Sequence, residues 1–407
     1  MTLHTIETEQ PQEDSLERVL LVRQPICRPD RQLFGFDLLC EGTVSAWEIL
    51  ANVFLSVGVK KLAGNRPIFI KMDRKMFTAE HADCLPNRSL VLELPADIEA
   101  TSGTMDLCRS IKRLGHSIAV RTEAPDWQNW LALADYLRID IGAPNAETDV
   151  RVRRPTQVKA IADHVDTNDE LRKAAGLGFQ LCSGRFLALP APVNSRALKG
   201  SYSVQRCLLT EVLKDSIDLG KVARLISQDV ALTLKLLCYL NSAAFAWRSK
   251  IKSVQHAISL LGEDELRKWT CLAMVTSTGQ SRNSPLLVKC LVRARFGELI
   301  TAKVESARSS SMMFLLGLLS MLDAILQVPM EELLNDLNLD DRIRDTLMKT
   351  GKTDSTIRWL YALIETYDEG DWVRSMAIMA NLGLNHRFVL GAYIEAVEWA
   401  EQISQLA

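Results

Sequence analysis

The sequence lacks several features that would assign it to a function class at once. Its 407 residues contain no C-x-x-C pair, and the nine cysteines are scattered along the chain. An odd, scattered set argues against a disulfide framework and for reduced thiols in a cytoplasmic protein. The formal charge of −2 gives no global electrostatic case for nucleic acid. We therefore expect a cytoplasmic protein with no nucleic-acid partner.

Long apolar runs are also scarce. The longest, residues 312–328, contains Asp323 and is short for a membrane span of about 20 residues. A buried core helix is the favoured interpretation. The first ten residues are polar and acidic, which argues against a secretory signal. These patterns predict that the chain does not insert into a membrane.

The clearest positive feature is a change of pattern near residue 190. Residues 1–16 are typical of a disordered tail. Between 17 and 192, short β-rich runs alternate with helix-length segments, which predicts parallel strands joined by crossovers. Residues 193–202 are expected to be a linker, and 203–407 show helical apolar spacing. The predicted fold is a TIM-barrel-like α/β domain followed by an all-α bundle.

Four strand-end segments of the first domain share a further pattern. They are GFDLLCE at 35–41, IFIKMD at 68–73, LVLELP at 90–95 and YLRID at 136–140. In this order they resemble signature strands of the EAL family, bacterial enzymes that open cyclic di-GMP with two metal ions. The resemblance implies a site at the carboxyl ends of barrel strands. The stretch between Glu41 and Pro67 is shorter than in the family, which implies a truncated or distorted barrel.

Several positions that the resemblance assigns to metals or substrate carry different chemistry. Asp37 stands at the Glu position of the EAL triplet, Glu41 at a phosphate-contacting Arg, and Lys71 at a metal-binding Asn. Glu93 and Asp140 match retained acids. The resemblance thus leaves part of the acidic set in place and reverses charge elsewhere.

The later strands depart from the family in the same way. Arg121 and Thr122 replace an Asp-Asp pair, and Arg138 replaces a Lys that contacts the catalytic water. Asp163 lies in ADHVD (162–166), which replaces Ala-Glu-Gly-Val-Glu. We interpret these nine positions as a vestigial site and assign no catalytic residue, no metal and no cofactor.

Two of the replaced metal-binding positions are now cationic. Removing metal ions from a cluster of acids without replacement would force like charges together. We therefore expect Lys71 and Arg121 to form ion pairs with Asp37 and Glu93. The alternative is that all four side chains point to solvent.

The helical half carries its own pattern in residues 227–245, 251–262 and 266–269. It resembles the HDOD family, which has an Asp before a helix ending in Leu-x-x-x-Asn-Ser-Ala-x-Phe, then Ile-x-Ser-x-x-x-Ala-Ile-x-x-Leu-Gly. Asn241 and Ser242 are interpreted as fold-defining, with ligand binding as the alternative. His256 is interpreted as a core or capping residue rather than a ligand. The motif positions are Asp229, Asn241, Ser242, Ser253, His256, Gly262 and Trp269.

HDOD domains are related to HD phosphohydrolases, which hold metal with a His-Asp pair on a helix. The segment that looks equivalent, residues 317–323, offers Ser320 and Met321 at those positions. Neither is a ligand that a hard metal ion prefers. The helical half is therefore also predicted to lack a metal site.

Together these features favour a two-domain EAL–HDOD signalling protein from a bacterium. The leading hypothesis is a non-enzymatic adaptor that acts through protein partners. A second hypothesis is a receptor that binds cyclic di-GMP without hydrolysis. A third, less favoured, is an active phosphodiesterase.

Overall fold

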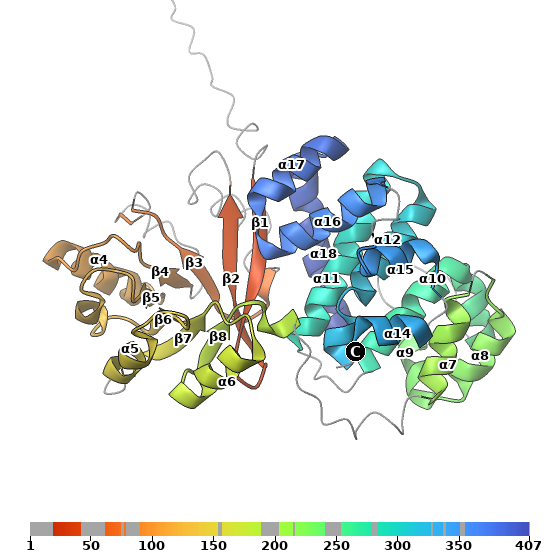
Figure 1. Ribbon diagram of the computed structural model, residues 1–407, viewed down its shortest axis with the longest axis horizontal. Helices are drawn as coiled ribbons and strands as arrows, with labels where there is room; N and C mark the ends of the chain where they lie inside the picture. The colour runs from red at the N-terminus through yellow and green to blue at the C-terminus, as the bar shows by residue number, and fades with distance from the viewer. Residues whose placement is uncertain are drawn as a thin grey trace, which may run out of the picture.

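The computed structural model describes two bodies that lie side by side, a strand barrel and a helical bundle (Figure 1). The described residues are 19–41, 62–74, 77–78, 90–153, 157–188, 203–214, 216–240, 254–277, 284–326, 329–336, 339–350 and 355–406. The predicted tail at 1–16 and linker at 193–202 lie outside them, so the domain boundaries stay predictions.

The first body is a closed barrel of eight strands. This confirms the predicted barrel class and shows that the ring is complete. Helices α4 (Ser102–Arg113), α5 (Ala146–Arg153) and α6 (Asn168–Leu177) follow strands β4, β6 and β7. The strands are β1 (Leu20–Cys27), β2 (Leu33–Glu41), β3 (Ile68–Lys71), β4 (Val91–Glu93), β5 (Ser117–Arg121), β6 (Tyr136–Asp140), β7 (Lys159–Asp163) and β8 (Leu181–Ser183).

Strand β1 runs opposite to all the others. It pairs antiparallel with both β2 and β8, whereas β2 to β8 are mutually parallel. The expectation of parallel strands therefore fails at β1. Only residues 28–32 join β1 to β2, and so short a connection makes a hairpin, because a parallel crossover needs a dozen residues or more.

The reversed strand leaves part of its edge outside the barrel. β1 pairs with β8 only through Ile26 and Cys27. Further along, the backbone N–H of Arg23 donates to the Tyr393 hydroxyl at 3.1 Å, and that of Leu21 to the Tyr367 hydroxyl at 3.4 Å. Both tyrosines belong to the helical body, which therefore covers backbone donors that a free strand edge would expose.

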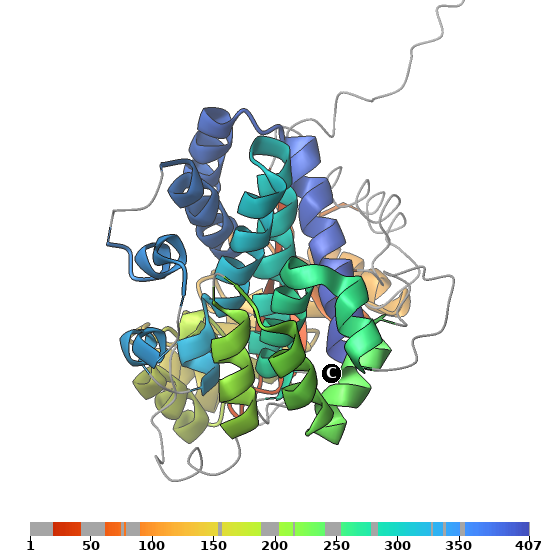
Figure 2. The same cartoon turned by 90° about the vertical axis from the view of Figure 1, so that its right-hand side faces the viewer.

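In the residues that the structure describes, the second body contains helices and no strand, as predicted. Helix α11 lies inside it, packed against α12 and α18, and Figure 2 faces this bundle. Buried residues occur on all sides of α11, as in a central core helix. The helices are α7 (Ser203–Val212), α8 (Leu219–Ser227), α9 (Val230–Leu240), α10 (Val254–Ser277), α11 (Pro285–Val304), α12 (Ala307–Leu319), α13 (Leu322–Leu326), α14 (Met330–Asp336), α15 (Asp341–Leu347), α16 (Ser355–Glu369), α17 (Trp372–Leu382) and α18 (His386–Leu406).

The longest apolar run of the sequence falls on α12 and α13. The predicted single helix breaks at Ser320, which ends α12. Within the described part of the chain, one stretch, Arg308–Ile325, is apolar and long enough to span a membrane by composition and length alone, and 72% of it is buried inside the protein.

The HDOD motif residues that the structure describes occupy structural positions. Asp229 caps α9, accepting from the Leu232 N–H at 3.1 Å, as predicted. Gly262 has φ +74° and interrupts α10, while Trp269 is buried in the core. Asn241, Ser242 and Ser253 lie outside the described residues, as does the side chain of His256.

Candidate functional site at the barrel mouth

The candidate site is one inward-facing layer of the barrel. A lower layer is apolar and contains Phe69, Val91, Ala119, Tyr136, Ile161 and Leu181. Residues two positions further along a strand face the same side, so the next layer is Lys71, Glu93, Arg121, Arg138, Asp163 and Ser183. Asp37 of β2 and Gln24 of the reversed β1 complete it. We call these eight residues, one from each strand, the mouth layer; all eight line a cavity of about 280 Å³.

Arg138 lies at the centre of the mouth layer and is 5% exposed. Its guanidinium donates to both carboxylate oxygens of Asp37, at 2.5 and 2.9 Å, and to those of Asp163, at 2.7 and 2.9 Å. Its Nη1 also lies 3.1 Å from Glu93. Burial alone would lower the pKa of Arg138, but Asp37, Asp163 and Glu93 outweigh it and hold the pKa well above the ordinary value.

Arg121 is the second cation of the mouth layer. It contacts Glu93 at 3.2 Å and Asp163 at 3.1 Å, and reaches Glu123 at 3.3 Å. Burial raises the pKa of Glu93, against the lowering effect of Arg138 and Arg121. The predicted pair of Arg121 with Glu93 is confirmed.

The predicted pair of Lys71 with Asp37 is wrong. Asp37 is held by Arg138 and by the Ser183 hydroxyl, which donates to it at 3.2 Å. Lys71 ends β3 with an exposed side chain, and it forms no ion pair with any residue in the described ranges. The guanidinium of Arg138 contacts three carboxylates with donors arranged in a planar fork of five, whereas an ammonium has three donors on a single nitrogen.

The remaining predicted residues lie around the mouth layer. Glu41 is exposed at the end of β2, away from the contacts of Arg138. The Thr122 backbone N–H donates to the Arg138 carbonyl at 3.0 Å. Asp140 accepts from the Gly142 N–H at 2.8 Å and lies 3.0 Å from His164 Nδ1. Burial raises the pKa of Asp140, but these hydrogen bonds outweigh it, and the net effect lowers that pKa.

The mouth layer as arranged does not fit a pair of metal ions. Two-metal hydrolysis needs ligands around cations about 3.5–4 Å apart. Here the guanidinium of Arg138 occupies the space between Asp37, Glu93 and Asp163. Within the described ranges, no group of three or more His, Cys, Asp or Glu could hold a metal ion.

Sequence reasoning missed two members of the mouth layer. Ser183 was not among the candidate site residues, and Gln24 was not considered. Gln24 lies directly opposite Asp37 in the β1–β2 register. Gln24 could have been found from the direction of β1. Gln24 precedes the inward-facing Ile26 by two positions, so in a reversed strand it lies in the layer above Ile26, at the barrel mouth. The short connection at 28–32 could have indicated that reversal.

A second buried arginine lies at the predicted HD position of the helical body. Arg293 of α11 donates to the Ser320 hydroxyl at 3.2 Å and to Asp368 at 2.7 Å. Lys289 also contacts Asp368, at 3.0 Å. We call Lys289, Arg293, Ser320 and Asp368 the Arg293 cluster. Met321 is buried beside it in the core.

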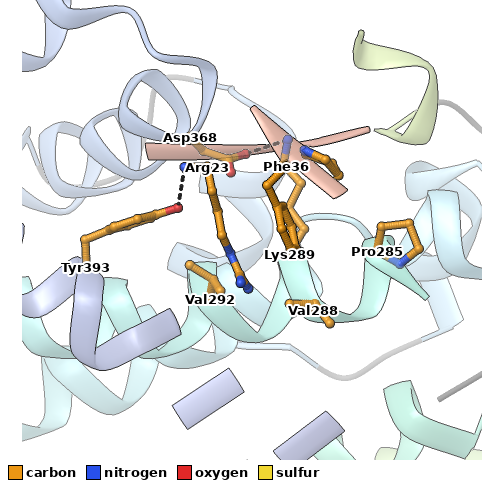
Figure 3. A pocket seen from close by; sticks show the side chains of 9 residues that line it. Arg23, Phe36, Pro285, Val288, Lys289, Val292, Asp368 and Tyr393 are labelled. Carbon is orange, nitrogen blue, oxygen red and sulfur yellow. Dashed lines mark hydrogen bonds and ion pairs between the residues drawn. The ribbon is translucent and has the colours of Figure 1, made fainter. Parts of the chain in front are cut away.

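The two bodies meet beside the Arg293 cluster. A cavity of about 20 Å³ between them is lined by Arg23 and Phe36 from the barrel and by Lys289, Asp368 and Tyr393 from the bundle (Figure 3). Arg23 is buried, lies over the Phe36 ring at 4.3 Å and pairs with Glu401 at 2.9 Å. The interface therefore contains charged groups held by partners from both bodies.

Comparisons with known proteins agree with the two-body architecture. The HDOD domain family matches residues 202–337. The cyclic di-GMP phosphodiesterase CdgJ of Vibrio cholerae is 25% identical over 417 residues, which cover 98% of this chain and 96% of CdgJ. The uncharacterized protein YuxH of Bacillus subtilis is 25% identical over 415 residues, 95% of this chain and 99% of YuxH.

Solved structures similar to this chain include one named a phosphodiesterase and one named an EAL domain protein. The PaMucR phosphodiesterase in complex with c-di-GMP is 18% identical to this chain. The match covers 43% of this chain and 98% of the PaMucR chain, with a TM-score of 0.34. An EAL domain protein from Listeria monocytogenes is 13% identical to this chain. The match covers 42% of this chain and 89% of the Listeria chain, with a TM-score of 0.35.

One expectation is contradicted by these comparisons. We expected a protein that is not an enzyme, whereas a relative that matches nearly the whole chain is named a phosphodiesterase. That finding points toward enzyme activity. The expectation counted replaced positions one by one and did not foresee that Asp37, Glu93 and Asp163 converge on one point. The eight-stranded barrel and the HDOD match at residues 202–337 fit a two-domain protein of the EAL–HDOD type.

Proposed function

We propose that this protein acts in cyclic di-GMP signalling and that the barrel mouth receives the cyclic dinucleotide. The observation that carries the proposal is Lys71, an exposed cation on the rim of the 280 Å³ cavity. The cavity lies at the carboxyl ends of strands β2 to β8, where barrel proteins place their ligand sites. The name of the Vibrio cholerae relative supports the ligand class.

Charge explains why Lys71 is the residue that would contact a phosphate. Arg121 and Arg138 already contact the carboxyl groups of Asp37, Glu93 and Asp163, at 2.5–3.2 Å. Lys71 shares none of those contacts, so its ammonium is available to a ligand. The cavity is close to the lower limit of small-molecule pockets, about 300 Å³, so it would admit one half of a dinucleotide.

Calorimetric titration of the full chain with cyclic di-GMP tests this proposal. A hydrogen bond to a charged group contributes about 1.5–3 kcal/mol, so Lys71→Met is expected to weaken binding by roughly 10- to 100-fold. Lys159→Met is the matched control, because Lys159 begins β7 at the opposite end of the barrel. No heat of binding to the wild-type chain, or equal affinity in Lys71→Met, would contradict the proposal.

Hydrolysis of cyclic di-GMP is a second candidate. It is favoured by the convergence of Asp37, Glu93 and Asp163 and by the name of the same relative. A turnover assay with Mg²⁺ or Mn²⁺ tests it. Product formation by the wild-type chain that is lost in Glu93→Gln would support it, and equal rates in both proteins would assign the activity to a contaminant.

Protein partners remain part of the proposal. We place their contact surface on the helical body, where helix α17 exposes 77% of Val373 and 38% of Met376. Affinity capture from a bacterial lysate, with the full chain and a Val373→Asp variant as baits, tests it. A protein that the wild type captures and the variant does not would support it. The cytoplasmic location also stays a prediction.

A further inference from the structure

The mouth layer and the Arg293 cluster lie in different bodies, but two consecutive residues connect them. Asp368 belongs to the Arg293 cluster, and Glu369 contacts the mouth layer. The connection begins at Gln24, the member of the mouth layer that faces the bundle. Its side-chain amide donates from Nε2 to the carbonyl of Glu369 at 3.0 Å. Glu369 ends α16. One hydrogen bond therefore joins the rim of the barrel to the last residue of a bundle helix.

The turn after Glu369 fits closely against the barrel. Gly370 has φ +73°, a conformation that side chains other than glycine rarely adopt. A Cβ at this position would lie 3.0 Å from the Leu39 side chain and 3.7 Å from Gln24 Nε2. Both Leu39 and Gln24 line the mouth cavity. The turn between α16 and α17 is thus packed directly behind the cavity wall.

The residue before Glu369 belongs to the Arg293 cluster. Asp368 is held by Arg293 at 2.7 Å and by Lys289 at 3.0 Å. Lys289 and Asp368 lie at the contact between the bodies (Figure 3). Two consecutive residues are therefore held from different sides. The Asp368 side chain is held by the Arg293 cluster, and the Glu369 carbonyl is held by Gln24 of the mouth layer.

The end of α16 has little freedom to absorb a displacement on one side. The Tyr367 hydroxyl accepts from the Leu21 N–H, and the Tyr367 ring packs edge-on against Trp372 of α17, with 5.5 Å between centroids. Tyr367 is fully buried. Closely packed elements transmit small shifts because their interiors are dense.

We propose that Gln24 is a positioning residue that couples the barrel mouth to the Arg293 cluster through the end of α16. Asp37 links Arg138 to this path, because Asp37 lies opposite Gln24 in register. A change in the hydrogen bonds or ion pairs that hold Asp37 alters the hydrogen bond from Gln24 to Glu369. The coupling belongs to the protein itself and does not depend on which ligand the mouth binds.

Hydrogen exchange of the full chain, followed by mass spectrometry, tests the coupling without any ligand. The perturbing variant is Ser183→Ala, which removes one donor to Asp37 and leaves the ion pairs in place. We expect amide exchange in residues 366–374 to change by about threefold or more. Arg138→Gln is a stronger perturbation of the same layer. Lys112→Gln is the control, because it cuts the pair of Lys112 with Asp135 at the other end of the barrel.

Gln24→Met completes a double-mutant cycle, since methionine keeps the size of the side chain and removes the donor. In the Gln24→Met background, Ser183→Ala is expected to leave exchange in residues 366–374 unchanged. If Gln24 had only a structural role, Gln24→Met and Ser183→Ala would change the exchange rates independently, and the double variant would show the product of the two changes. Exchange changes confined to the barrel, or a change in residues 366–374 that persists with Gln24→Met or occurs equally in Lys112→Gln, would overturn the proposal.

Discussion

At the scale of single residues, Arg138 determines the electrostatics of the barrel mouth. Among the described residues, it alone contacts all three buried carboxylates of the mouth layer. Removing one partner from a buried ion cluster leaves charge without compensation, and this costs far more than cutting an exposed pair. The sequence comparison identified position 138 as a replaced lysine, but only the fold shows that its guanidinium is central.

Replacement of Arg138 should therefore be strongly destabilising. For Arg138→Gln we expect a loss of about 3–5 kcal/mol in the free energy of unfolding. Arg109→Gln is the control, because Arg109 pairs with Asp106 on the exposed face of α4, and its loss should be below about 1 kcal/mol. Urea denaturation measures both, and equal losses would contradict a central role for Arg138.

The buried acid Glu93 should give the protein a pH dependence of stability. Burial raises its folded pKa above the ordinary value of 4.5, so the folded state holds this proton more tightly than the unfolded state. The contribution of Glu93 thus favours folding at acidic pH and is lost as pH rises through the folded pKa. The stability of the wild type relative to Glu93→Gln should fall as the pH rises above 4.5. Thermal melts of both proteins at a series of pH values above 4.5 measure this stability difference. A difference that rises with pH would contradict the prediction.

At the scale of elements, the accuracy of sequence reasoning depended on length and pattern. Strand β6 was identified at its observed bounds, Tyr136–Asp140, because it is a distinct segment of ordinary strand length. Strand β8 has only three residues and shows no period. The direction of β1 was missed because alternation of strands and helices says nothing about the first connection. That reversal also hid Gln24, so the wall of the site nearest the bundle could not be predicted.

The contact between α11 and α12 gives a test at the same scale. A Cβ at Gly317 would come within 2.6 Å of the Arg293 backbone and 2.7 Å of the Ala294 Cα. Gly317→Ala must therefore separate the two helices, at a cost of about 1–3 kcal/mol. Gly391→Ala is the matched control, because nothing lies within 4 Å of its Cβ and alanine favours a helix by up to about 1 kcal/mol. Chemical denaturation should show a lower free energy of unfolding for Gly317→Ala and a higher one for Gly391→Ala. Changes of the same sign would contradict the close packing at Gly317.

At the scale of the whole molecule, the bundle completes a barrel whose first strand is only partly paired. Tyr367 and Tyr393 satisfy two backbone donors of β1, and Arg23 pairs with Glu401 across the interface. Composition and periodicity predicted both bodies, but the interface depends on single hydroxyl groups from distant residues. No local pattern encodes such a contact, because residues 23 and 393 are remote in the chain.

Loss of a tyrosine hydroxyl should weaken this interface. Tyr393→Phe leaves the Arg23 N–H without its partner, which costs about 1–3 kcal/mol for a buried group. Tyr367→Phe should cost less, because its hydrogen bond is longer, 3.4 Å against 3.1 Å. Denaturant melts followed by tryptophan fluorescence compare the two variants. A neutral Tyr393→Phe would show that the β1 edge does not depend on the bundle.

The most direct test of the central claim is a crystal structure of the full chain grown with Mn²⁺, with anomalous scattering used to locate the ion. We predict that the Arg138 guanidinium lies between Asp37, Glu93 and Asp163, and that the mouth layer shows no manganese peak. A manganese peak between those carboxylates, with Arg138 turned away, would contradict this account of the mouth and favour metal-dependent hydrolysis.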